Sequence, residues 1–131
     1  SAASDVYKRQ VQGSSAFVTG VPYILDEMLY NLADNAVKYN RPGGSVTVTA
    51  EKRGGETVLS VADTGIGIPY EHQNRVFERF YRVDKSHSRQ LGGTGLGLSI
   101  VKHAAAMHKA RLELWSEPDA GTKITVHFDG Q

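Results

Sequence analysis

Residues 63–68 read Asp63-Thr64-Gly65-Ile66-Gly67-Ile68, and a second glycine cluster follows as Gly92-Gly93-Thr94-Gly95-Leu96-Gly97-Leu98. Glycine is needed where a backbone takes a positive φ or comes very close to a ligand. The 31-residue segment from Gly65 to Gly95 shows little periodicity apart from a short predicted helix around Glu71 to Phe80. A loop of that length in a small domain is usually functional, or else it indicates a mistaken assignment of secondary structure. Two glycine clusters around it therefore indicate a nucleotide pocket with a lid over residues 65–95.

The periods of apolar residues predict the elements around these clusters. Apolar side chains recur at three- and four-residue steps from Val21 to Tyr39 and from Leu96 to His108, the spacing of amphipathic helices. Strands are predicted at residues 46–50, 57–62, 111–116 and 123–128, the first two joined as a hairpin. We expect an α+β fold, a two-layer sandwich in which about three helices cover one face of a mixed, mainly antiparallel sheet.

Length and composition predict one domain. The chain has 131 residues, of which 40% are hydrophobic, enough for one core and too few for two. Residues 1–15 are mostly small, polar or charged and show no period. They are predicted to be a linker, a tail or a cloning remnant, with the domain proper over residues 16–131.

Charge and cysteine content argue against several kinds of partner and site. The 15 basic and 14 acidic residues are well mixed and give a net charge of +1, which argues against a nucleic-acid or membrane-surface partner. There are no cysteines for disulfides or thiolate metal sites. No apolar run approaches the ~18 residues of a membrane span, and no secretory signal is recognisable. We expect a soluble, cytoplasmic domain without membrane contact.

A row of polar side chains lies on the first predicted helix. Glu27, Asn31 and Asn35 are four residues apart and Lys38 follows after three, so they share one face. Such a row can be ordinary solvated surface. However, two asparagines lower the helix propensity, a local cost typical of functional sites, and an amide oxygen is a ligand suited to Mg²⁺.

Each glycine cluster suits a different part of a nucleotide. Asp63 ends a predicted strand, where its carboxylate could accept a hydrogen bond from an exocyclic amine such as that of adenine, although the same string alone is a common turn. The second cluster opens a helix whose free N–H groups suit a phosphate, although it could also be a plain helix start. Neither matches a Walker P-loop or a dinucleotide fingerprint.

Together these strings resemble the motif boxes of sensor histidine kinases. The matches are Asn31 to Tyr39 with the N box, Asp63 to Gly67 with the first glycine box, Phe77 to Arg82 with the F box, and Gly93 to Leu98 with the second glycine box. The four motifs occur in the family's order. The similarity runs from about Phe17 to Phe128, and residues 81–86 and 100–103 most resemble the group that includes phosphate-starvation sensors.

The resemblance implies the Bergerat ATP-binding fold, shared with DNA gyrase, mismatch-repair ATPases and heat-shock chaperones, with ATP and Mg²⁺ as ligands. By match of position, Asn35 would be the principal Mg²⁺ ligand and Asn31 would assist. Lys38 would face the phosphates, and Arg82 would meet the γ-phosphate when the lid closes. Together with Asn31 and Glu27, these two residues form the expected catalytic set.

The resemblance also implies how the nucleotide is held. Tyr39 would pack against the purine, and Asp63 would bond its amine. Gly65 and Gly67 would give the base access to the backbone, and Thr122 would lie at the rear of the adenine site. The full expected nucleotide-binding set is Asn35, Tyr39, Asp63, Gly65, Gly67, Ile68, Phe80, Gly93, Thr94, Gly95, Leu96, Gly97 and Thr122.

One position distinguishes a kinase from a hydrolase. In the gyrase and chaperone branch, a glutamate four residues before the metal-binding asparagine activates water. Asn31 stands at that position, and an amide cannot act as a general base. Hydrolysis is therefore predicted to be slow, and the γ-phosphoryl group is expected to go to a histidine.

The resemblance places the accepting histidine outside this domain. Family members carry it on an upstream helical hairpin, followed by Glu or Asp and a proline, a context that none of the five histidines has. The expected partners are an own or cognate dimerisation domain with that histidine and, indirectly, a response regulator. The isolated domain is expected to be a monomer from the cytoplasmic portion of a membrane-bound sensor. Alternative functions are a nucleotide-sensing module without transfer, a slow ATPase and an anti-sigma-factor serine kinase.

Two positions depart from the family pattern. Lys109-Ala110 stands where Gly-Gly usually follows the second predicted helix, so that turn must avoid a positive φ or bear its strain. Val21 stands where an acidic residue often precedes the N-box helix, which weakens the expected N-cap.

Overall fold

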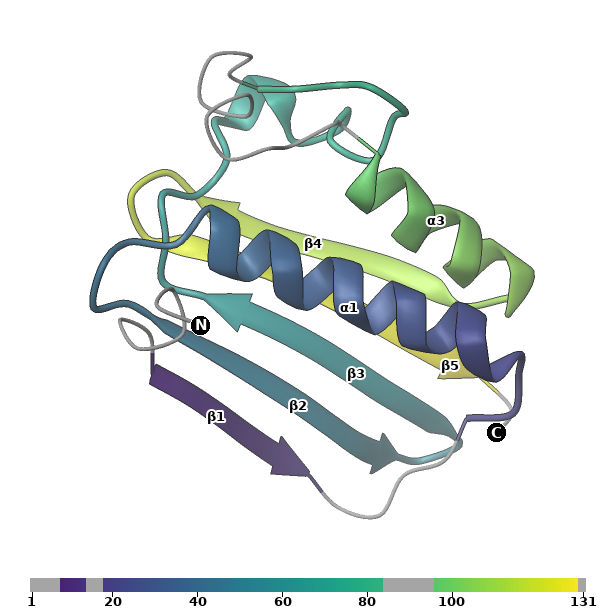
Figure 1. Ribbon diagram of the computed structural model, residues 1–131. Coiled ribbons are helices and arrows are strands. Elements are labelled where there is room, and N and C mark those ends of the chain that lie inside the picture. The colour runs from purple at the N-terminus through teal and green to yellow at the C-terminus, as the bar shows by residue number, and fades with distance from the viewer. Residues whose placement is uncertain (1–7, 14–17, 84–95, 130–131) are drawn as a thin grey trace.

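Two α-helices pack on one face of a five-stranded sheet (Figure 1). The structure, a computed structural model, describes residues 8–13 through their backbone, and residues 18–83 and 96–129 in full. The elements are β1 (Lys8–Gly13), α1 (Pro22–Lys38), β2 (Ser45–Arg53), β3 (Glu56–Asp63), the 3₁₀ helix η2 (Tyr70–His72), α3 (Gly97–Met107), β4 (Arg111–Glu117) and β5 (Gly121–Asp129).

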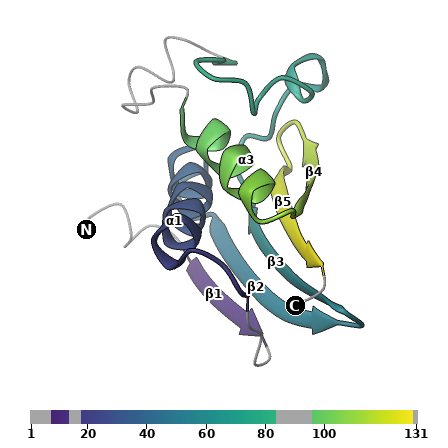
Figure 2. The ribbon, with the colours of Figure 1, turned by 90° about the vertical axis from the view of Figure 1, so that its right-hand side faces the viewer.

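The two-layer α+β sandwich is confirmed, and both long predicted helices are present. Figure 2 shows α1 and α3 on the same side of the sheet. Of the about three helices expected, the described residues contain two α-helices and one short 3₁₀ helix. No helix among these residues is both long and apolar enough to cross a bilayer.

The strands are ordered β1-β2-β3-β5-β4. The pairs β2–β3, β3–β5 and β4–β5 are antiparallel, whereas β1 runs parallel to β2, so the sheet is mixed and mainly antiparallel as predicted. Because β5 lies between β3 and β4, the end of β3 meets the start of β5, and Asp63 pairs with Thr122. The sheet order thus brings together two predicted site residues that are far apart in the sequence.

Residues 8–13 correct the expectation that the first 15 residues are an irregular linker or tail. They form β1, paired with β2 from Lys8↔Ser45 to Gly13↔Ala50. The sequence Lys-Arg-Gln-Val-Gln-Gly has no apolar alternation, so its pattern gives no strand signal. An edge strand can be held by backbone pairing alone, and charged side chains there discourage further pairing.

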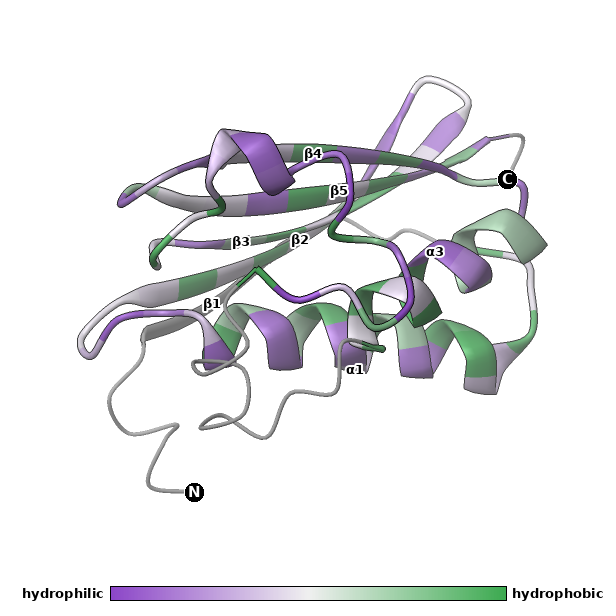
Figure 3. Cartoon of the chain, turned by 90° about the horizontal axis from the view of Figure 1, so that it is seen from above, coloured by the Kyte–Doolittle hydropathy of each residue, from purple (hydrophilic) through white to green (hydrophobic). Residues whose placement is uncertain are grey.

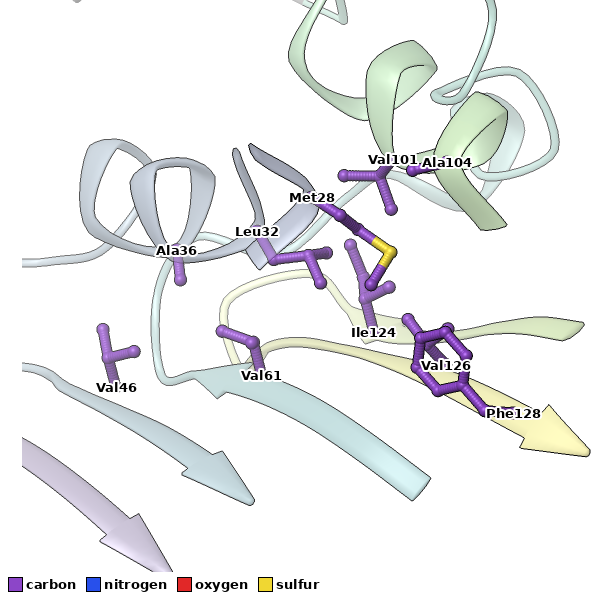
Figure 4. Packing of buried hydrophobic residues seen from close by; sticks show 10 residues of the cluster. All are labelled: Met28, Leu32, Ala36, Val46, Val61, Val101, Ala104, Ile124, Val126 and Phe128. Carbon is purple, nitrogen blue, oxygen red and sulfur yellow. The ribbon is translucent and has the colours of Figure 1, made fainter. Parts of the chain in front are cut away.

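The core lies between the helices and the sheet (Figure 4). Met28 and Leu32 of α1 are 1% and 2% exposed and form its centre, together with Phe128 of β5. Figure 3 shows the alternation of hydrophobic and hydrophilic residues along α1 that this one-sided burial requires. The other members of the cluster are Ala36, Val46, Val61, Val101, Ala104, Ile124 and Val126.

The N-terminus of α1 is capped from another helix. Its N-cap residue, Val21, makes no side-chain cap hydrogen bond, as the departure from the family pattern predicts. Its backbone N–H instead donates to His108 Nε2 at 3.1 Å, and His108 Nδ1 lies 2.7 Å from Ala104 O. Because the carbonyl can only accept, the proton of the neutral ring sits on Nδ1. His108 therefore joins the end of α3 to the start of α1.

The turn after α3 is a Schellman motif closed by a lysine. Ala110 N–H donates to Ala105 O at 2.8 Å and Lys109 N–H to Ala106 O at 3.1 Å, the paired bonds of that motif. Lys109 has a φ of 53°, in the left-handed region that glycine adopts without cost. The chain keeps the turn without the family's glycines. The left-handed conformation of Lys109 lowers the free energy of unfolding by about 1 kcal/mol.

The short helix expected around Glu71 to Phe80 is present only as the 3₁₀ helix η2 (Tyr70–His72). After η2, the chain forms successive three-residue turns, in which Arg75 N–H donates to His72 O and Glu78 N–H to Arg75 O at 3.0 and 2.9 Å. The side chain of Gln73 also donates to Ile68 O and Ser116 O at 2.9 and 3.0 Å. These contacts with the loop after β3 and with β4 hold residues 73–80 in turns. An α-helix would instead need regular hydrogen bonds from each N–H to the carbonyl four residues earlier.

Candidate functional site

Asn31, in the polar row of α1, faces the start of α3. Asn31 Nδ2 donates to Glu27 O at 2.8 Å, so the amide is oriented and its Oδ1 is left as an acceptor. A Cβ added to Gly97 would lie 3.4 Å from Asn31 Oδ1. The structure therefore brings together the N-box helix and the end of the second glycine box, as the sequence predicts. Asn31 and Asn35 are half-buried, whereas Glu27 is exposed.

Lys38 already has an anionic partner. Its Nζ lies 3.0 Å from Asp34 Oδ2, one helical turn earlier, and both side chains are about one-third exposed. The sequence reasoning missed Asp34, although the i to i+4 spacing of opposite charges signals such a pair. A phosphate that reaches Lys38 would replace the Asp34 carboxylate as the anionic partner of its ammonium group.

Asp63 is a buried acceptor at the end of β3. It is 9% exposed, and its Oδ1 accepts the backbone N–H of Gly65 at 2.9 Å. The backbone of Thr122 also hydrogen-bonds this carboxyl. Burial raises the pKa of Asp63 to about 6, against the lowering effect of those two hydrogen bonds. A carboxylate offers about four lone-pair sites, so acceptor capacity remains for a ligand amine.

The glycines of the first box have a structural reason of their own. A Cβ on Gly65 would lie 2.1 Å from Tyr39 O, and one on Gly67 would lie 2.1 Å from Glu117 O. Gly67 also has a φ of 71°. Ile66 N–H donates to Tyr39 O at 3.1 Å. Both glycines are thus required by the close approach of protein backbone, which the expectation of ligand access alone did not foresee.

A buried serine, which the sequence reasoning missed, links the rear of this region. Ser116 Oγ lies 2.8 Å from Ile68 N, 2.9 Å from Gly121 O and 2.8 Å from Thr122 Oγ1. The available signal was alternation, because Leu112, Leu114 and Ser116 occupy successive same-face positions of β4. A serine that continues an apolar row is a candidate for a buried polar contact.

The F box follows the turns after η2. Tyr81 OH contacts His72 Nδ1, and the guanidinium of Arg75 lies 4.5 Å from the Tyr81 ring centroid. Phe80 is 62% exposed and has a φ of 65°, a strained conformation for a bulky residue. Arg82 is half-buried near the end of the described segment. Tyr81 is therefore anchored while Phe80 faces solvent.

Of the remaining predicted residues, some lie in the part of the chain that the structure describes and some do not. Leu96 is half-buried and accepts Ile100 N–H at 3.0 Å, at the start of α3. Ile68 and Tyr39 are half-buried on the loop after β3 and at the end of α1. Gly93, Thr94 and Gly95 lie outside the described residues.

The donor atoms fit a metal that arrives with a nucleotide. Within residues 18–83 and 96–129, no group of three or more His, Cys, Asp or Glu is arranged to hold a metal ion. The neutral amide oxygens of Asn31 and Asn35 suit Mg²⁺, which binds few protein ligands and completes its octahedron with phosphates and water.

Comparisons with known proteins place this geometry in context. Residues 20–131 match a family model described as histidine kinase-, DNA gyrase B- and HSP90-like ATPase. The chain is 49% identical over 109 residues to the sensor-like histidine kinase SenX3 of Mycolicibacterium smegmatis, covering 83% of this chain and 28% of that protein. It is 50% identical over 100 residues to the phosphate regulon sensor protein PhoR of Pseudomonas aeruginosa, covering 75% and 22%. The chain thus spans less than a third of these curated relatives.

Solved structures agree with the sequence relatives. The mycobacterial sensor histidine kinase MprB superposes with a TM-score of 0.86 at 31% identity, over 97% of this chain and 86% of that one. Full-length ShkA in complex with AMPPNP superposes with a TM-score of 0.77 at 31% identity, over 95% of this chain and 26% of that one.

Proposed function

Because the chain belongs to the family of histidine kinase-, DNA gyrase B- and HSP90-like ATPases, we propose that it binds ATP with Mg²⁺ and donates the γ-phosphoryl group to a histidine on a separate dimerisation domain. Its fold is the Bergerat-like fold of histidine kinase catalytic domains, and its curated relatives are sensor histidine kinases. The proposal extends to a catalytic unit that includes β1 and so begins before residue 16, to the cytoplasmic portion of a sensor as its location, and to a response regulator as the indirect recipient.

The observation that carries this proposal is the environment of Asn31. Its amide is held by the 2.8 Å bond to Glu27 O and faces Gly97, at the start of α3. An amide cannot take a proton from water, so this position favours retention of the γ-phosphoryl group over hydrolysis. The exposed Glu27 lies one turn away and contributes a backbone carbonyl to that hydrogen bond.

In this proposal the base binds at the end of β3. Asp63 accepts the adenine amine, Tyr39 packs on the purine, and Thr122 closes the rear of the site. Support comes from the burial of Asp63 and from its pairing with Thr122. Gly65, Gly67 and Ile68 shape the floor of this end of the site because they fix the loop against Tyr39, Glu117 and Ser116.

The phosphates bind between α1 and the start of α3. Asn35, with Asn31, holds the Mg²⁺ ion, which supplies charge neutralisation to the phosphate oxygens. Lys38 exchanges Asp34 for a phosphate, and Leu96 and Gly97 present backbone to the phosphate chain. Gly93, Thr94 and Gly95, which lie outside the described residues, belong to the proposed phosphate-binding set. Arg82 reaches the γ-phosphate from the lid, and Phe80 closes over the nucleotide.

The direct test is transfer to a histidine. The chain is mixed with [γ-³²P]ATP, Mg²⁺ and the histidine-bearing dimerisation domain of its own kinase, and acid-labile label on that domain is measured. We expect label on the dimerisation domain that an Arg82→Ala variant reduces by at least tenfold. No label despite proven ATP binding would favour the nucleotide-sensing module, whereas steady phosphate release would favour the slow ATPase and labelled serine the serine kinase.

A further inference from the structure

Ser116 lies at the centre of a buried hydrogen-bond network behind Asp63. Ser116 and Thr122 are each 6% exposed, so their hydroxyl groups must find partners within the protein. Ser116 Oγ reaches three of them: Ile68 N at 2.8 Å, Gly121 O at 2.9 Å and Thr122 Oγ1 at 2.8 Å. The network joins the loop after β3, the end of β4 and the start of β5 at one oxygen.

The chemistry of these partners fixes the direction of each bond. A backbone N–H can only donate and a carbonyl can only accept, while a serine hydroxyl has one proton. Ser116 therefore accepts from Ile68 and gives its proton to Gly121 O. The bond to Thr122 can then form only if Thr122 donates its own proton to Ser116 Oγ. Thr122 Oγ1 is left with lone pairs and no free proton.

Thr122 is therefore a second acceptor beside the Asp63 carboxylate. The two residues are paired across β3 and β5, so their side chains emerge side by side on the same face. The backbone of Thr122 also hydrogen-bonds the Asp63 carboxyl, which ties the two groups together. An exocyclic amine has two N–H donors to offer such a pair, whereas a carbonyl oxygen would meet acceptors only.

We infer that Ser116 is a positioning residue for base selection: by holding Thr122 as an acceptor, it makes the site favour a 6-amino purine over a 6-oxo purine. This inference rests on the proposed nucleotide site and adds a determinant to it. Ser116 acts through Thr122, without contact with the nucleotide. Without Ser116, the Thr122 hydroxyl is free to rotate and to donate a proton to a 6-oxo group.

The test compares ATP with inosine triphosphate, which carries oxygen in place of the amine and a proton on N1. Dissociation constants for both nucleotides are measured by calorimetry on the whole chain and on Ser116→Ala, Thr122→Val and Ser60→Ala variants. Ser60 is a matched control because it is equally buried, at 6% exposure, but lies at an alternate position of β3 that faces away from the helices. Thermal unfolding of each variant checks its folding.

We expect the preference for ATP to fall about three- to tenfold in Ser116→Ala and in Thr122→Val, the range of one neutral hydrogen bond, and to stay unchanged in Ser60→Ala. A purely structural role for Ser116 would weaken both nucleotides by the same factor and would overturn the inference. If Ser116→Ala does not fold, Thr122→Val decides, because an unchanged preference there contradicts the acceptor role. Failure of the unaltered chain to bind either nucleotide would reject the proposed function itself, and this inference with it.

Discussion

Replacement of Asp63 by asparagine separates the binding role of this carboxyl from its effect on stability. The amide oxygen of Asn can keep the 2.9 Å bond from Gly65 N–H, but its NH₂ group then occupies the other acceptor position. A base amine would meet a donor instead of a charged acceptor. A hydrogen bond to a charged group is worth about 1.5–3 kcal/mol, so ATP affinity should fall about 10- to 100-fold.

The same substitution should not weaken the fold. Burial raises the pKa of Asp63 to about 6, which means that the folded protein disfavours the ionised carboxyl. The stability that this group contributes is complete below its unfolded pKa and is lost as the pH rises through about 6. At pH 7.5 a neutral amide removes this burial penalty, but its NH₂ group cannot accept the backbone N–H of Thr122. The two effects oppose each other, so the melting temperature should change little.

Calorimetric titration with ATP and thermal unfolding at pH 7.5 measure the two effects on the same samples. Asp26→Asn is the control, because Asp26 is exposed on α1 and should alter neither quantity. The reasoning is refuted if Asp63→Asn binds ATP within about threefold of the unaltered chain. It is also refuted if affinity and melting temperature fall together, because Asp63 would then act through folding.

Four further predictions concern other parts of the account. ATP affinity should fall about tenfold from pH 7 to pH 5, because Asp63, whose pKa is about 6, becomes protonated. Calorimetry of Asp63→Asn should lack this pH-dependent fall in affinity. An equal fall in that variant would contradict the role of Asp63 as the acceptor of the base amine. Asn31→Glu should raise phosphate release from ATP at least tenfold, because it supplies a general base; a coupled phosphate assay that shows no gain would count against the distinction between kinase and hydrolase. Lys109→Gly should raise the free energy of unfolding by about 1 kcal/mol in urea, since Lys109 has a φ of 53°; a loss of stability would disprove strain at that turn. Leu32→Ala should lower the free energy of unfolding by about 2–5 kcal/mol, because Leu32 is 2% exposed. A loss below about 1 kcal/mol would mean that the core around Leu32 is less closely packed than the structure shows.

The sequence predicts the elements that bury one face. The apolar stripe of α1 and the strands β2 to β5 appear close to their predicted bounds, because each places apolar side chains at the period of its secondary structure. The β2–β3 hairpin follows from the two glycines at its turn, Gly54 and Gly55. The strand β1 could not be predicted in this way, because residues 8–13 show no apolar alternation; the structure shows this strand paired with β2 at the edge of the sheet.

Local motifs suggest which residues are candidates for the site, but they do not specify the contacts that these residues make in the structure. Sheet order pairs Asp63 with Thr122, and helix packing brings Asn31 to Gly97; local patterns specify neither contact. The backbone contact that requires Gly65 is also long-range, since it joins the loop after β3 to Tyr39 O. Ser116 has no motif of its own, and its importance emerges only from three neighbours on separate segments.

The measurement that tests the central claim most directly is calorimetry of ATP binding with and without Mg²⁺ on the unaltered chain and on Asn35→Ala. Asn74→Ala, at an exposed position in the turns after η2, is the control. The account predicts that Mg²⁺ strengthens ATP binding to the unaltered chain and to the control, and that Asn35→Ala loses most of this metal dependence. The account is contradicted if ATP does not bind, or if Asn35→Ala keeps the full effect of Mg²⁺.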